Sequence, residues 1–154
     1  MDDNSRGTWV FLLAHKSEAF EKIKIFYETV NTQFDRKIKV SRSDNALELS
    51  DHQCIKFFND NGNVHQTSIA DKAQQHVVVE RKHSHLLEIS RALRFQSGLS
   101  LGYWGDCVLT AAHIINRLPS SVRNNKTPYE IIFKEKPDYS RLKSFGCLTM
   151  AYST

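Results

Sequence analysis

Two acidic residues stand where carboxylates could hold metal ions. Asp44 follows an alternating segment typical of a strand, and Glu80 lies near the start of a long helical pattern. Magnesium takes oxygen ligands, and two such ions stabilise the attacking and leaving oxygens of a phosphoryl displacement. With 35 residues between them, Asp44 and Glu80 would meet if the helix packed across the carboxyl end of the strand.

Spacing alone leaves an ordinary interpretation open. The chain contains 17 acidic residues, so many carboxylate pairs occur by chance. Charged residues on turns and helices usually face water, which makes Asp44 a simple turn residue and Glu80 a solvated one. A two-metal site also needs about three acidic side chains, so this pair by itself would be a weak site.

Strand and helix patterns alternate along the chain, which predicts an α/β fold. Ser17 and Thr127 are suitable N-caps, while Gly62 and Gly98 are expected to end helices. Strands are expected at 8–14, 37–42 and 63–68 and at the end of 142–152. Helices are expected at 17–33, 46–59, 76–96 and 103–117, and from Pro128 onward.

Composition fits one globular domain, since 40% of the residues are hydrophobic and 25% are charged. The net charge of +4 favours polyanionic partners, but an ordinary basic domain would have it too. The apolar run 9–14 is too short to span a membrane and lacks a signal-peptide layout. Three cysteines without a Cys-x-x-Cys pair indicate a reducing compartment. We therefore expect a nuclear or cytoplasmic protein that is not secreted.

Basic residues cluster around Glu80. Arg81, Lys82, His83 and His85 could contact phosphates, or they could form a solvated face. His83 and His85 are poor zinc ligands as a pair, because residues two apart point to different faces of a helix.

Four ordered blocks of sequence carry a resemblance to a known family. They are KIKVSRSDNALELS, HVVVERKHSHLLEISRAL, GYWGDCVLTAAHIINRLPSSVRNNKTPYEIIF and PDYSRLKSFGCL. From Asp2 to about Tyr152 the chain resembles the integrase region of a plant copia-type long-terminal-repeat retrotransposon polyprotein. The resemblance implies a ribonuclease-H-like integrase core of the α/β class and DDE-type transfer of DNA strands.

The resemblance also implies roles for single residues. Asp44 and Glu80 match the second and third catalytic carboxylates, which would hold Mg²⁺ or Mn²⁺. The DNA partners would be retroelement cDNA ends and target DNA, and the helix at 103–117 is either core or the surface of a homo-oligomer. Residues implied to bind nucleic acid are Asn45, Gln74, Gln75, Arg81 and Lys82.

The sequence departs from the family pattern in several places. No block matches the Asp-Val-x-Gly-Pro motif of the first catalytic Asp, so we expect an incomplete mixed sheet that lacks its first strands. Ala46 and Ala73 stand where relatives have Gly and Pro.

These departures set the expected domains and activity. We expect a partial integrase catalytic domain at 1–138, a post-core segment at 139–154, and no catalysis by the fragment alone. The alternative is a non-catalytic nucleic-acid-binding or inert retroelement-derived fragment.

Overall fold

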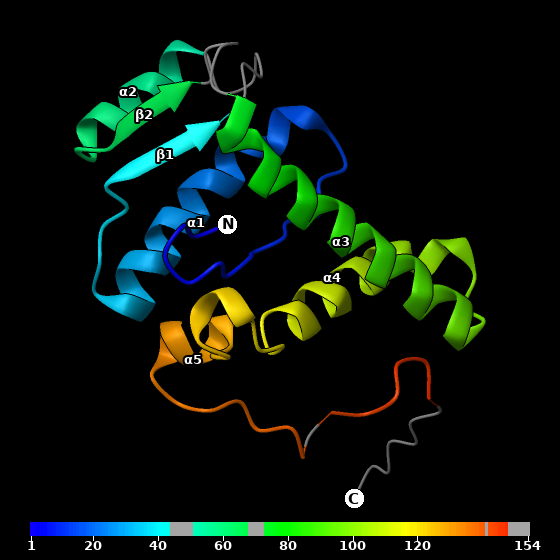
Figure 1. Ribbon diagram of the computed structural model, residues 1–154. Helices are drawn as coiled ribbons and strands as arrows, with labels where there is room; N and C mark the ends of the chain where they lie inside the picture. Colours follow the sequence, from blue (N-terminus) through cyan, green and yellow to red (C-terminus); the bar gives the residue numbers. More distant parts are fainter. Residues whose placement is uncertain (44–50, 68–72, 141, 148–154) are drawn as a thin grey trace, which may run out of the picture. The chain divides into compact units, whose positions relative to one another are not determined.

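The structure is a computed structural model that describes residues 1–43, 51–67, 73–140 and 142–147, with only the backbone described for 73–76. Its backbone divides into two compact units. Residues 11–74 form the first, here called the sheet unit. Residues 1–10 and 75–154 form the second, here called the helical unit. Figure 1 traces the elements of both units along the chain.

The sheet unit is built from two helices and two short strands (Figure 1). Its strands are parallel, with Val40 opposite Val64 and Ser43 opposite Thr67. This order confirms the expected helix–strand–helix–strand pattern, and Gly62 follows α2 at a φ of 65° as expected. The elements are α1 (Ala19–Phe34), β1 (Val40–Ser43), α2 (His52–Asp60) and β2 (Val64–Thr67).

Aromatic rings from α1, α2 and β2 form the interior of the sheet unit. The Tyr27 ring lies 5.2 Å from Phe57 and 5.9 Å from Phe58 between centroids. Phe58 is buried and lies 4.7 Å from the His65 ring. The Tyr27 hydroxyl is 2.7 Å from Ser41 Oγ, so this polar atom is satisfied at the edge of the rings. These contacts join both helices of the unit to its sheet.

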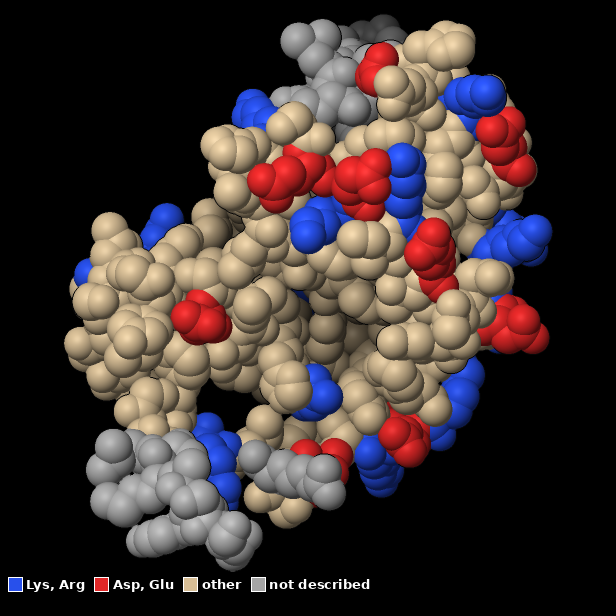
Figure 2. All heavy atoms as spheres, turned by 180° about the vertical axis from the view of Figure 1, so that it is seen from behind, with Lys and Arg blue, Asp and Glu red and all other residues tan. Residues whose placement is uncertain are grey.

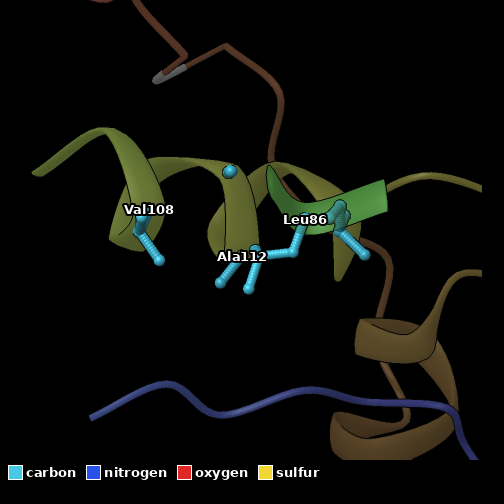
Figure 3. Packing of buried hydrophobic residues seen from close by; sticks show 5 residues of the cluster. Leu86, Val108 and Ala112 are labelled. Atoms are coloured by element: carbon cyan, nitrogen blue, oxygen red, sulfur yellow. The ribbon is translucent and has the colours of Figure 1, made fainter. Parts of the chain in front are cut away.

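The helical unit is organised around α3 (Ala73–Ser97) and α4 (Trp104–Ile115), with α5 (Pro128–Phe133) after them. Gly98 follows α3 at a φ of 66°, which confirms the expected helix end. Figure 3 shows Leu86 of α3 beside Val108 and Ala112 of α4. The buried cluster consists of Leu86, Val108, Ala111, Ala112 and Ile115.

The start of α5 confirms the expected cap. The Glu130 N–H donates to Thr127 Oγ1 at 3.0 Å, and the Thr127 N–H donates to Glu130 Oε2 at 2.8 Å. Pro128 occupies the first turn, where its missing N–H has no helical partner to lose. Thr127 and Pro128 therefore begin this helix as their residue types predict.

The prediction of a buried strand at 8–14 is wrong. This segment is in neither of the two described strands, and Phe11, Leu12 and Leu13 are each at least 41% exposed. Instead, the side chain of Asn116, directly after α4, hydrogen-bonds to the backbone of Thr8. Asn116 Oδ1 accepts from the Thr8 N–H at 2.9 Å, and Asn116 Nδ2 donates to the Thr8 carbonyl oxygen at 2.8 Å. A strand needs a neighbouring strand to form its ladder, and none is described beside this segment.

Three smaller expectations also change. The long helix begins at Ala73 rather than at about His76, since Ala and Gln favour helix where a Pro would not. Ser17 is not the cap, because it lies inside the turn Lys16–Glu18 that precedes α1. Residues 142–147 of the expected last strand form no strand, and 148–152 lie outside the described residues.

The segment after α5 packs against the helices of its own unit. Pro137 is buried, and the Tyr139 hydroxyl donates to the Arg117 carbonyl oxygen at 2.8 Å. Gly146 has a φ of 81°, and a Cβ there would lie 2.5 Å from Cβ of Ser97. Only glycine fits this close approach without displacing the end of α3.

Candidate carboxylate site and nucleic-acid interface

Glu80 lies on α3 and is exposed to solvent. None of the described basic residues forms an ion pair with it. A carboxylate that is exposed and has no ion-pair partner among the described residues is accessible to a cation from solvent. This matches the role implied for Glu80, although exposure is equally typical of a solvated helix residue.

Asp44 and Asn45 lie outside the described residues, so their pairing with Glu80 stays a prediction. Asp44 directly follows β1 in the chain, and the last residue of this strand is well fixed. Ser43 pairs with Thr67 in the sheet, and Ser43 Oγ lies 2.9 Å from His65 Nε2. The backbone that leads to Asp44 is therefore anchored by both the ladder and a side-chain hydrogen bond.

Gln74 and Gln75 lie on the backbone of α3, where the sequence indicated an irregular segment. Their side chains are outside the described part of the chain, so a contact with nucleic acid stays a prediction. Arg81 is exposed on the same helix. An exposed arginine can reach a phosphate without any rearrangement of the core.

Lys82 differs from Arg81, because it is half-buried. Burial lowers the pKa of its ammonium group, and the positive charge of Arg6 lowers that pKa further. Arg6 forms an ion pair with Asp3 at 2.9 Å between Nη1 and Oδ1. Lys82 itself has no ion pair with any described carboxylate. A half-buried cation beside a second cation is a local cost that a bound anion would relieve.

Metal ligands do not cluster in the part of the chain that the structure describes. No group of three His, Cys, Asp or Glu side chains there could hold a metal ion. His83 and His85 are both exposed on α3. Glu80 offers the oxygen donor that Mg²⁺ prefers, but one described carboxylate is not a donor set.

Charges of both signs are mixed on the surface seen in Figure 2. Lysine and arginine side chains lie among aspartate and glutamate on that face. Any nucleic-acid contact on this face therefore depends on particular residues rather than on one broad basic patch.

A membrane-spanning helix would need a long apolar stretch, and none of the helices in the described part of the chain has one.

A solved structure shares the fold of this chain. The structure matches the HTLV-2 integrase catalytic core domain, solved in complex with magnesium in a trimeric form. The TM-score is 0.57 at 15% sequence identity, and the match covers 76% of this chain and 71% of that one. The fold is therefore that of a ribonuclease-H-like integrase core, which confirms the expected fold class.

Sequence relatives come from plant transposons. The chain is 31% identical over 152 residues to the retrovirus-related Pol polyprotein from transposon TNT 1-94 of Nicotiana tabacum, covering 99% of this chain. It is 31% identical over 147 residues to that from transposon RE2 of Arabidopsis thaliana. It spans about a tenth of these relatives, namely 11% and 10%. No protein-family model matches. Over nearly its whole length, the chain is therefore similar to a short part of the retrovirus-related Pol polyproteins of plant transposons.

Two residues near the expected site had no signal in the sequence. The positive charge of Arg6 acts on Lys82, 76 residues further along the chain, and His65 Nε2 lies 2.9 Å from Ser43 Oγ across the sheet. Both interactions join segments that are distant in sequence, so periodicity and short motifs do not reveal them. Only the fold brings these side chains to the residues that flank Asp44 and Glu80 in sequence.

Proposed function

We propose that this chain is the catalytic-core segment of a retrotransposon integrase, a DDE-type polynucleotidyl transferase that acts on DNA. The observation that carries this proposal is the integrase-core fold in a chain related over 99% of its length to a transposon Pol polyprotein. The substrates would be retroelement cDNA ends and target DNA. The partial catalytic domain would cover 1–138, followed by a post-core segment at 139–154.

Asp44 and Glu80 would supply carboxylate oxygens to Mg²⁺ or Mn²⁺, the donor type these ions take. When bound, such ions would stabilise the negative charge that develops on the oxygens around the attacked phosphorus. Glu80 is exposed, and no described basic residue forms an ion pair with it, so its carboxylate oxygens are accessible to a cation. Asn45, Gln74 and Gln75 would contact the DNA near these carboxylates.

Arg81 and Lys82 would bind phosphates of the DNA backbone. Exposed Arg81 would contact a phosphate from solvent. The charge of Lys82 is opposed by burial and by Arg6, so an incoming phosphate would stabilise its ammonium form. Both residues follow Glu80 directly on α3. Phosphate binding there would fix the position of DNA against the carboxylate.

We expect the 154-residue polypeptide to be catalytically incompetent by itself. The proposed chemistry needs about three acidic ligands, and the sequence matches only the second and third of the family. Integrase cores of this kind would also act as oligomers, for which α4 is one candidate surface.

A strand-transfer assay tests this proposal. The 154-residue chain and a polypeptide extended upstream with its own locus sequence are each given Mg²⁺, a labelled donor duplex and a plasmid target. If the extension carries the first Asp motif, we expect joined products only from the extended polypeptide. Glu80→Gln should abolish joining, while Glu88→Gln, an exposed carboxylate on the same helix, should leave it intact. Equal joining by the Glu80→Gln variant would refute the proposed role of Glu80.

A non-catalytic nucleic-acid-binding module is the second candidate. The specific observation in its favour is the pair of cations at Lys82 and Arg6, which needs no metal to attract a phosphate. In this case duplex binding should weaken steeply with salt and persist in Asp44→Asn. Binding that does not change with salt would exclude this candidate.

A further inference from the structure

A shallow hollow lies on the helical unit at the carboxyl end of α3. Its volume is about 320 Å³, and it is lined by Arg91, Arg94, Phe95, Leu101 and Trp104. The hollow is far from the proposed carboxylate site, because Phe95 follows Glu80 by about 22 Å of helical rise. The proposed chemistry makes no use of these five residues.

Two apolar side chains of the hollow are largely exposed to solvent. Phe95 is 75% exposed and Leu101 is 66% exposed, which is unusual for side chains of this size. Arg91, Arg94 and Phe95 lie three and four residues apart, so they occupy one face of α3. Exposed rings beside cations on one helical face are typical of a binding surface rather than of a core.

Two arginines supply the charge that lines the hollow. No described carboxylate forms an ion pair with Arg91 or Arg94, and no acidic residue lines the hollow. Arg94 Nε is buried without a hydrogen-bond partner among the described residues. The Arg94 guanidinium lies 5.4 Å from the centroid of the Phe95 ring. Arg94 also lies in the last turn of α3, where a cation stabilises the helix end, but this explains neither Arg91 nor the exposed ring.

We propose that this hollow binds single-stranded nucleic acid, with a base stacked on Phe95 and the neighbouring phosphate between Arg91 and Arg94. Base stacking on an aromatic ring beside arginines is the usual design of single-strand binding surfaces. A duplex keeps its bases paired and so offers none to the ring. The site would hold a DNA or RNA strand away from the carboxylates.

The size of the hollow favours a nucleotide over a protein partner. A stable protein interface buries roughly 800 Å² on each side and involves about 20 residues or more. This hollow is lined by only five residues, and its volume is near the lower end of ligand pockets, roughly 300 Å³. A planar anionic group matches both its size and its charge.

The test is fluorescence anisotropy with a labelled oligothymidylate of about 12 nucleotides, within the site sizes of single-strand binders. The full chain is used with a chelator present, so the result is independent of metal and of the proposed chemistry. We expect Phe95→Ala to weaken binding about tenfold and Phe95→Trp to preserve it. Arg91→Gln should also weaken binding and lower the salt slope by about 0.7.

Two variants serve as matched controls. Val122→Ala truncates a side chain that is 78% exposed outside the hollow, and Lys136→Gln removes one exposed positive charge on the same unit. Neither should change binding by more than about twofold, since neither residue lines the hollow. Circular dichroism of each variant confirms that it remains folded.

Two results would overturn the proposal. One is unchanged oligothymidylate binding in both Phe95→Ala and Arg91→Gln. The other is a loss of self-association in these variants, measured by sedimentation velocity, while oligothymidylate binding stays at the level of the wild type. That second result would make the hollow a protein interface instead.

Discussion

The amide of Asn116 contacts both backbone groups of Thr8, donating to its carbonyl oxygen and accepting from its N–H. A neighbouring strand satisfies such groups in a sheet, but here one side chain does so. The backbone carbonyl oxygen of Asn116 also accepts from the Tyr129 N–H at 2.9 Å. Asn116 therefore links the amino-terminal segment, α4 and α5 of the helical unit.

Asn116→Asp should destabilise the chain by about 2 kcal/mol, because it removes the donor and leaves the Thr8 carbonyl facing a carboxylate. Urea unfolding monitored by circular dichroism measures the effect. The control is Asn125→Asp, which makes the same charge change at an exposed position. An equal loss of stability in both variants would show that charge, rather than the Thr8 contact, causes the effect.

Lys82→Met should separate stability from binding. The substitution keeps an unbranched stem but removes a charge that is opposed by burial and by Arg6, so the melting temperature should rise slightly. Duplex DNA affinity should fall, and the salt slope should decrease by about one. Lys136→Met, at an exposed position, should change neither quantity much. A lower melting temperature for Lys82→Met would contradict this account.

At the scale of elements, α5 is the helix whose start depends most clearly on charge. Hydrogen bonds from the Thr127 backbone N–H and with its side chain lower the pKa of Glu130 below the ordinary 4.5. The ionised form is thus stabilised in the folded state. The contribution of ionised Glu130 to the stability of the folded state is complete above pH 4.5, and it is lost as the pH falls through the lowered pKa.

Wild type should therefore lose more stability on acidification below about pH 4.5 than Glu130→Gln does, because Gln cannot titrate. Thermal melts of both chains across this range measure the difference. At neutral pH the wild type should be the more stable of the two. Parallel acid curves for the two chains would mean that the Glu130 hydrogen bonds are not maintained in solution.

Local signals predicted most of these elements. Thr127, Pro128, Gly62 and Gly98 marked helix boundaries through backbone chemistry that operates within a few residues. The strand at 8–14 failed because β-branched and aromatic residues indicate a strand only where a partner strand exists. The effect of the Arg6 charge on Lys82 and the hollow at Phe95 could not be predicted for a related reason, since both depend on tertiary packing. The pairing of Asp44 with Glu80 stays a prediction that came from the resemblance.

At the scale of the whole molecule, the described sheet has only two strands. Small sheets need further strands or a large packed face for independent stability. Phe11, Leu12 and Val64 are each at least 43% exposed, so apolar surface near this sheet remains in water. Both features favour low stability of the described sheet.

We therefore expect the 154-residue chain to be marginally stable or poorly soluble by itself. Circular dichroism on heating should show a broad transition or aggregation well below the ordinary range of mesophilic domains. Static light scattering on the same sample detects aggregation. A sharp and reversible melt above about 50 °C would contradict this expectation.

Asp44 and Glu80 are proposed to supply ligands to the same metal ion, and paramagnetic NMR with Mn²⁺ can detect whether they do. Mn²⁺ broadens amide signals near its binding site, so wild type should lose signals around both residues together. Asp44→Asn and Glu80→Gln should each restore both sets, while Glu88→Gln, exposed on the same helix, should restore neither. Broadening confined to one of the two regions, or unchanged in Asp44→Asn and Glu80→Gln, would contradict the account.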